Sequence, residues 1–187
     1  MRSLLLASMV GLAAFSARGA GVGVFGGTMD TEDFGEGTTL GAKIEADIYG
    51  ILGLEIRGAY NYDFKDKGLG LEDFEMYAAE AGLRIRLPLG EYISLHAGAG
   101  VGYYIMPEFD ATMPDGRTVS SDIDDMPGAY GLAGAEVGVE NLRLFAEAKY
   151  LYLRPDLVES DFLQQRYTPI DTDLSGLSLL VGVLVRW

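Results

Sequence analysis

The chain has 187 residues, of which 49 % are apolar and 26 are glycine, so it has the size of one folded domain and is too apolar for a disordered chain. It contains no cysteine, which excludes disulfides, thiolate metal sites and a lipid anchor attached through cysteine. The formal net charge is −14 and no segment clusters Lys and Arg, so we expect no nucleic-acid partner.

The first 19 residues have the order of a secretory signal peptide. Arg2 gives a short basic start, residues 4–15 form an apolar run too short to span a bilayer comfortably, and small residues follow. Cleavage after Ser16 or after Gly19 would in each case leave small residues at the first and third positions before the cut. A short membrane anchor is the alternative. We expect cleavage and a mature domain of residues 20–187.

A period of two in hydrophobicity follows, and it indicates strands because successive side chains of a strand lie on opposite faces. In residues 40–48, for example, Ile44 and Ala46 alternate with Lys43 and Glu45. The predicted strands are residues 21–29, 40–48, 54–64, 77–87, 92–106, 128–139, 142–152 and 177–187. The first, fifth and sixth of these are glycine-rich and less charged.

The predicted connections alternate in length. Short turns are expected at residues 49–53, 88–91 and 140–141, and long polar loops at residues 30–39, 65–73, 107–126 and 154–173. Short turns at one end and long loops at the other are typical of outer-membrane barrels. We therefore predict an all-β fold, a closed antiparallel up-and-down transmembrane β-barrel of eight strands, with both chain ends on the periplasmic side.

Aromatic residues on the apolar face fall at the two ends of the predicted strands. Those at the long-loop ends are Tyr60, Tyr62, Phe64, Tyr77, Tyr103, Tyr150 and Tyr152, and those at the short-turn ends are Tyr49, Tyr92 and Trp187. A soluble barrel that encloses a ligand also alternates, but it has no reason to produce two aromatic belts. The belts favour a membrane with two water interfaces.

The polar face of the predicted barrel balances its charges. Its acids are Glu45, Asp47, Glu55, Asp63, Glu80, Glu136 and Glu147, and its bases are Lys43, Arg57, Arg84, Arg86, Arg143, Lys149 and Arg186. An eight-stranded barrel is just wide enough for its own side chains to fill. We predict a packed ion-pair network in the lumen, which also includes His96, and keep a narrow conduit as the alternative.

His96 is the single histidine of the chain, and Ser94 lies on the same strand face. A lipid hydrolase would need such a pair near the outer leaflet, but strand parity places both residues inside the barrel, close to a short turn. We therefore predict no enzyme. Gly98, Gly100 and Gly102 are not followed by the Lys of a phosphate loop, so they leave room in a narrow barrel and no cofactor is expected.

The long loops carry most of the remaining acidic residues. Asp122, Asp124 and Asp125, with Asp110 and Asp115 in the same loop, are candidate ligands for a divalent cation, although their spacing is not that of an EF-hand. An acidic surface also suits a cationic partner. A surface that is simply solvated is the alternative.

The final predicted strand reads Val181-Gly182-Val183-Leu184-Val185-Arg186-Trp187. Together with the signal peptide and the alternating strands, it resembles the small outer-membrane barrels related to the OmpA barrel, OmpX and the opacity-type surface proteins. The resemblance implies a place in the outer membrane of a Gram-negative bacterium, among its lipids and lipopolysaccharide. It also implies that the barrel-assembly machinery reads Val181, Val183, Val185 and Trp187.

Three functions remain, in order of preference. The first is a structural or surface-interaction barrel that displays acidic loops outside the cell, the second a narrow channel for ions or small solutes, and the third a lipid-modifying enzyme. The peptidoglycan-binding domain that follows the barrel in OmpA-type proteins is not seen in this sequence. We therefore do not expect a role as a tether to the cell wall.

Overall fold

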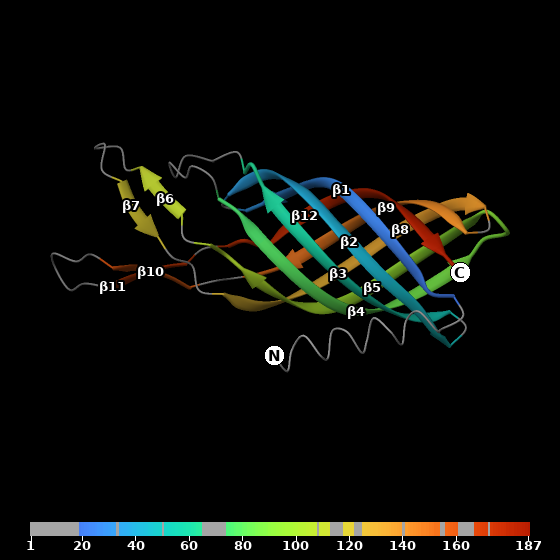
Figure 1. Cartoon of the computed structure of the whole chain (residues 1–187). Helices are drawn as coiled ribbons and strands as arrows, with labels where there is room; N and C mark the ends of the chain where they lie inside the picture. Colours follow the sequence, from blue (N-terminus) through green and yellow to red (C-terminus); the bar gives the residue numbers. More distant parts are fainter. Residues whose placement is uncertain are drawn as a thin grey trace, which may run out of the picture.

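The computed structural model describes residues 19–32, 34–49, 51–64, 74–107, 109–112, 118–121, 125–139, 141–153, 156–160, 167–171 and 173–187. Eight strands close into one antiparallel barrel in the order β1-β12-β9-β8-β5-β4-β3-β2 (Figure 1). They are β1 (Gly21–Thr31), β2 (Gly35–Tyr49), β3 (Leu52–Tyr62), β4 (Met76–Pro88), β5 (Ile93–Ile105), β8 (Met126–Val139), β9 (Leu142–Tyr152) and β12 (Gly176–Arg186). The predicted eight-stranded antiparallel barrel is confirmed.

Hydrophobic alternation sets which face of each strand points outward. On β1, Val24 is 61 % exposed whereas its neighbour Phe25 is 5 % exposed, and on β12 Val183 is 38 % exposed whereas Leu184 is fully buried. The outer wall is therefore a continuous aliphatic surface, and the polar face of each strand points into the barrel. Such a wall is stable only where an apolar solvent covers it.

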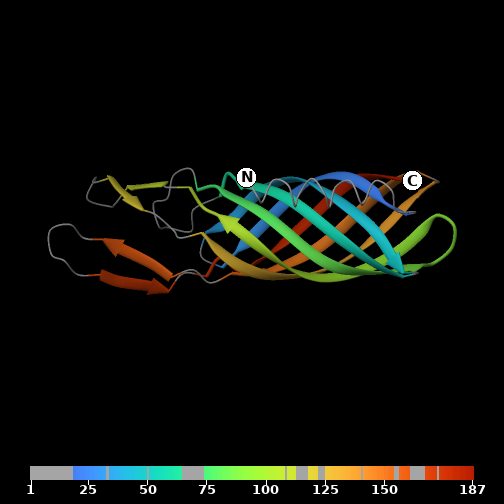
Figure 2. The same ribbon diagram turned by 60° about the horizontal axis from the view of Figure 1, so that its bottom comes forward.

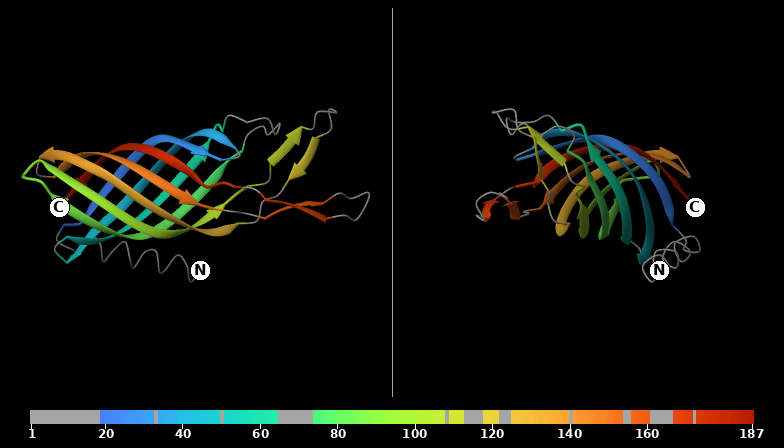
Figure 3. Two further views of the ribbon diagram at one scale, coloured as in Figure 1. Left: turned by 180° about the vertical axis from the view of Figure 1, so that it is seen from behind. Right: turned by 60° about the vertical axis from the view of Figure 1, so that its left-hand side comes forward.

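The first and last strands pair with each other and close the barrel. β1 and β12 are in register from Gly21 opposite Arg186 to Thr31 opposite Gly176. The backbone N–H of Trp187 donates to the carbonyl of Ala20 at 3.0 Å. The curved wall can be followed from two further sides in Figure 3. Among the described residues, no helix is long and apolar enough to cross a membrane.

The two ends of the barrel differ. At the turn end, short connections join β2 to β3, β4 to β5 and β8 to β9, and Trp187 lies there too. At the loop end, two extra hairpins extend beyond the wall: β6 (Phe109–Thr112) with β7 (Thr118–Ser121), and β10 (Asp156–Ser160) with β11 (Tyr167–Asp171) (Figures 1 and 2). The sequence predicts long polar loops here, and the structure adds these two hairpins within them.

The prediction of a long loop at residues 30–39 is wrong. β1 and β2 continue as a hairpin to a tight turn between Thr31 and Gly35, where Gly35 has a φ of 79°. The strand continues because burial still alternates there, with Glu36 exposed and Thr39 buried. The polar character of these residues conceals the alternation in the sequence.

The end of β3 also departs from prediction. Asp63 has a φ of 57°, so the alternation of the strand stops there. Asp63 is exposed instead of facing the lumen, and Phe64 turns back against the buried core instead of joining the outer belt. Residues 1–18, where most of the predicted signal peptide lies, are outside the described residues.

Candidate functional site: the barrel interior

An apolar plug closes the interior at the loop end. It comprises Phe34, Phe64, Phe74, Met106, Leu153 and Leu174 from the connections and Met29, Met76, Met126 and Leu151 from the strand ends, all packed into one cluster. Each of the four loop-end connections contributes at least one of these side chains. The plug therefore ties the base of every loop into the barrel.

Ring contacts and hydrogen bonds hold the plug in place. The ring of Phe74 stacks on Phe34 with 4.5 Å between centroids and meets Phe64 edge-on at 5.2 Å. The N–H of Phe34 donates to Oγ1 of Thr31 at 3.2 Å. These rings are almost fully removed from solvent, since Phe34 and Phe74 are each 2 % exposed. Sequence reasoning missed the plug, whose one signal is a bulky apolar residue directly beside a strand in an otherwise polar loop.

Below the plug lies an upper polar layer around Glu80 of β4. Its Oε1 accepts hydrogen bonds from Oη of Tyr104 (2.8 Å) and Nζ of Lys149 (2.6 Å). Beside it, Oγ1 of Thr39 donates to Oδ1 of Asn61 at 2.7 Å. All five residues are buried, so these hydrogen bonds are made inside the barrel rather than to water, and Oε2 of Glu80 is left without a hydrogen-bond partner among the described residues.

Glu147 of β9 is the centre of the middle layer. Its Oε1 accepts a hydrogen bond from Nζ of Lys43 at 2.5 Å and lies 3.0 Å from Nε2 of His96. Its Oε2 accepts a hydrogen bond from Nη2 of Arg57 at 2.8 Å. The four residues come from four strands and are all buried. Ion pairs in such a low-dielectric interior are strong, and leaving one charge without its partner costs several kcal/mol.

Glycines make room for the rings that line this layer. Lys43 Nζ lies 3.7 Å from the centroid of the Phe145 ring. A Cβ placed on Gly182 would come within 2.5 Å of Cζ of that ring. Phe145 can therefore reach across the lumen only because β12 has no side chain at this position.

The lowest layer, at the turn end, is a ring of guanidinium and carboxylate groups. Glu45 bonds both Arg84 and Arg186, and Glu136 accepts a hydrogen bond from Nη1 of Arg84 at 3.1 Å. Asp47 lies 3.6 Å from Nη1 of Arg186. The ring continues through Arg86 and Ser94, and Ser94 Oγ donates to Oε2 of Glu136 at 3.3 Å. Asp47 and Arg86 are partly exposed, so this layer meets solvent at the mouth.

The predicted lumen residues therefore share one interior. Those that form ion pairs are Lys43, Glu45, Asp47, Glu55, Arg57, Glu80, Arg84, Arg86, His96, Glu136, Glu147, Lys149 and Arg186. Arg143 also sits on the interior side of its strand, half-buried, but among the described residues it forms no ion pair. Without Asp63, the interior carries six carboxylates against seven Lys and Arg side chains.

His96 and Ser94 have structural partners. His96 contacts Glu147 and lies 3.7 Å from Glu136, and both His96 and Ser94 are nearly fully buried. Both residues therefore belong to the ion-pair network of the interior.

The candidate metal ligands are only partly described. Asp122 and Asp124 lie outside the described residues. Oδ1 of Asp125 accepts a hydrogen bond from the N–H of Met106 at 3.2 Å and so helps to fix the base of its loop. Among the described residues, no group of three or more His, Asp or Glu side chains is arranged to hold a metal ion.

The predicted girdle residues face outward. At the loop end, Tyr77, Tyr103, Tyr150 and Tyr152 are between 44 % and 52 % exposed; Tyr60 and Tyr62 are half-buried because they stack on each other at 5.0 Å. Tyr60 also donates a hydrogen bond to Glu75 at 2.6 Å. At the turn end, Tyr49, Tyr92 and Trp187 are exposed. The three outward valines of the final strand, Val181, Val183 and Val185, point the same way.

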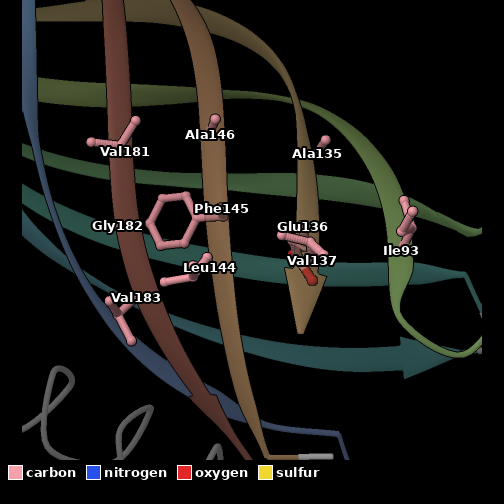
Figure 4. Close-up of a pocket in the computed structure, with 10 residues that line it drawn as sticks. All are labelled: Ile93, Ala135, Glu136, Val137, Leu144, Phe145, Ala146, Val181, Gly182 and Val183. Atoms are coloured by element: carbon pink, nitrogen blue, oxygen red, sulfur yellow. The ribbon is translucent and has the colours of Figure 1, made fainter. Parts of the chain in front are cut away.

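Two apolar grooves lie on this outer wall rather than in the lumen. One, of about 540 Å³, crosses β5, β8, β9 and β12 where Ala135 and Ala146 lie opposite each other, with Val137 and Val181 at its borders (Figure 4). The other, of about 440 Å³, lies beside Pro127. Both lie where small side chains leave hollows in an aliphatic wall.

No protein-family model matches the chain, and no curated protein matches it in sequence. Solved structures do match. Neisserial surface protein A is 16 % identical with a TM-score of 0.62, over 90 % of this chain and 97 % of that one. OprG of Pseudomonas aeruginosa is 16 % identical with a TM-score of 0.70, over 91 % and 97 %.

A third match is Ail, the attachment invasion locus protein of Yersinia pestis, in complex with the heparin analogue sucrose octasulfate. It is 16 % identical with a TM-score of 0.56, over 91 % of this chain and 99 % of that one. At these identities the likeness concerns the fold and not the activity. The chain has the fold of the small eight-stranded outer-membrane β-barrels.

Proposed function

We propose that this protein is an integral outer-membrane barrel that acts as a closed, rigid mount for surface loops. The observation that carries the proposal is the filled interior: an apolar plug at the loop end lies above three layers of paired polar side chains. A barrel packed in this way is poorly suited to passing solutes through its lumen. Its functional surface is then the outside, at the loop end.

The plug also explains how loops could be held for recognition. Because all four loop-end connections insert side chains into one buried cluster, the starting points of the loops are fixed relative to each other. Preorganised loop bases reduce the entropy that a partner must remove on binding. This is the arrangement expected of a scaffold that presents binding loops.

The negative charge at the loop end favours a partner of positive charge. Asp30, Glu32, Glu36 and Asp63 are exposed there, whereas every Lys and Arg that the structure describes lies on the interior side of its strand. We propose a cationic partner: a basic segment of another surface, or divalent ions that bridge to lipopolysaccharide phosphates. The sulfated ligand of Ail has the opposite charge, so we expect no binding of that compound here.

Binding of a Lys-rich peptide to the barrel in nanodiscs tests the proposal. Replacing Asp122 and Asp124 together by Asn should weaken binding, while Asp125 is kept because it bonds the backbone of Met106. The matched control replaces Glu91 and Glu140 by Gln, which removes the same charge from the turn end. Equal losses in the two pairs, or no binding by the wild type, would contradict a loop-end cation surface.

A further inference from the structure

The interior charges are distributed unevenly along the barrel. The upper and middle layers together hold three bases, Lys43, Arg57 and Lys149, and three acids, Glu55, Glu80 and Glu147. The turn-end layer holds four arginines, Arg84, Arg86, Arg143 and Arg186, but only three side-chain carboxylates, Glu45, Asp47 and Glu136. The positive excess among the interior side chains therefore lies at the turn-end mouth.

Arg143 accounts for that excess. The three carboxylates are shared among Arg84, Arg86 and Arg186, and no described residue forms an ion pair or hydrogen bond with Arg143. Its Nε is buried without a hydrogen-bond acceptor in the described part of the chain. A guanidinium in this position has donors available and no charge to neutralise it.

Arg186 supplies a second available donor. The side chain is 8 % exposed and uses its two Nη atoms on Glu45 and Asp47, but its Nε also finds no acceptor among the described residues. Arg143 lies opposite Leu184 in the pairing of β9 with β12, so Arg186 is its diagonal neighbour on the same interior face. Diagonal neighbours with side chains of this length can reach one ligand.

We infer that the turn-end mouth of the barrel binds a phosphate oxyanion between Arg143 and Arg186. Guanidinium forks match the oxygen geometry of phosphate, and one bound anion would neutralise the excess charge of this layer. The two Nε atoms are buried, but Arg143 itself is half-buried and Asp47 and Arg86 of the same layer are 25 % and 19 % exposed in their side chains, so the layer opens to solvent at the mouth. Phosphate could come from solution or from a phospholipid headgroup at the rim of the mouth. The loop-end plug and loops play no part in this site.

The test follows the Nε–H signal of Arg143 by ¹⁵N NMR in maltoside micelles, which contain no phosphate. Inorganic phosphate should shift the signal saturably, whereas chloride at equal ionic strength should not. In a second arm, dihexanoyl phosphatidylglycerol replaces inorganic phosphate. Saturation at lower concentration by the lipid would identify a headgroup site, and saturation by inorganic phosphate alone would identify a free-anion site.

Arg143→Gln should weaken phosphate binding about tenfold, as expected for one charge-assisted contact. In that variant binding is followed on the Nε–H of Arg186. Arg143→Lys should retain saturable binding because it keeps the charge, and Glu91→Gln, an exposed change on the nearby turn, should leave the affinity unchanged. An unchanged affinity in Arg143→Gln would overturn the assignment. A shift of the wild-type signal that rises linearly with phosphate concentration, as for chloride, would also overturn it. This second test does not require the variant to fold.

Discussion

Replacing Glu147 by Gln perturbs the centre of the interior network without changing its volume. The substitution removes the charge that faces Lys43 at 2.5 Å and Arg57 at 2.8 Å. Lys43 then keeps Glu55 at 3.5 Å and Glu45 at 3.9 Å, and Arg57 keeps Glu55 at 2.7 Å. One buried positive charge is left without compensation, although other carboxylates remain near.

Breaking a buried pair by removing one partner costs about 3–5 kcal/mol. Because the remaining acids compensate in part, we expect the lower end, about 3 kcal/mol, in the free energy of unfolding. Adding Lys43→Met to Glu147→Gln restores the original charge balance of the interior, so the double variant should be more stable than the sum of the two single losses by about 2 kcal/mol.

Urea unfolding of the barrel in lipid vesicles, read from gel mobility without boiling, measures these differences. Glu91→Gln is the matched control, because it makes the same chemical change at an exposed turn and should leave the unfolding curve in place. If Glu147→Gln behaves like this control, water already solvates Lys43 and Arg57, and the account of a dry, packed interior is wrong.

Three further changes test other parts of the structure in the same unfolding assay. Val183→Arg, on the outer wall, should cost about 2–4 kcal/mol if the position lies near the bilayer midplane; the shorter Val183→Ala should cost much less. Phe74→Ala removes the ring that joins Phe34 and Phe64 and should cost about 3–5 kcal/mol; a neutral result would mean that the plug is loosely packed. Gly182→Val places side-chain carbon atoms against the Phe145 ring and the Val24 carbonyl, so the barrel should not fold. The band of the folded barrel should then be missing from gels run without boiling.

The barrel itself could be predicted because a period of two is visible wherever one face of a strand is charged. Lys43 and Glu45 on β2, or Arg143 and Glu147 on β9, mark the interior face directly. Position along the strand then gives the layer of each residue to a first approximation. The number of barrel strands, and the side to which every strand charge except Asp63 points, follow from this pattern alone.

The remaining features depend on information that a periodic pattern does not contain. The φ of Asp63 is a local backbone choice, and it alone reverses the sides of Asp63 and Phe64. The plug forms from residues outside the strands, where no period relates Phe34 to Phe74 or Leu174. Arg143 has no ion pair among the described residues because Arg86 and Arg186 pair with the nearby carboxylates. Which base pairs with which acid is decided by distances in the folded barrel, and the sequence does not contain them.

The filled lumen is the central claim, and ion conductance tests it most directly. The purified barrel is reconstituted into a planar bilayer and its current recorded in KCl over a range of voltages. We predict no steady conductance above that of the bare membrane, because the buried side chains of the plug and of the paired layers occupy the lumen of an eight-stranded barrel. A reproducible unit conductance from the wild-type protein would contradict the sealed interior and support the narrow channel instead.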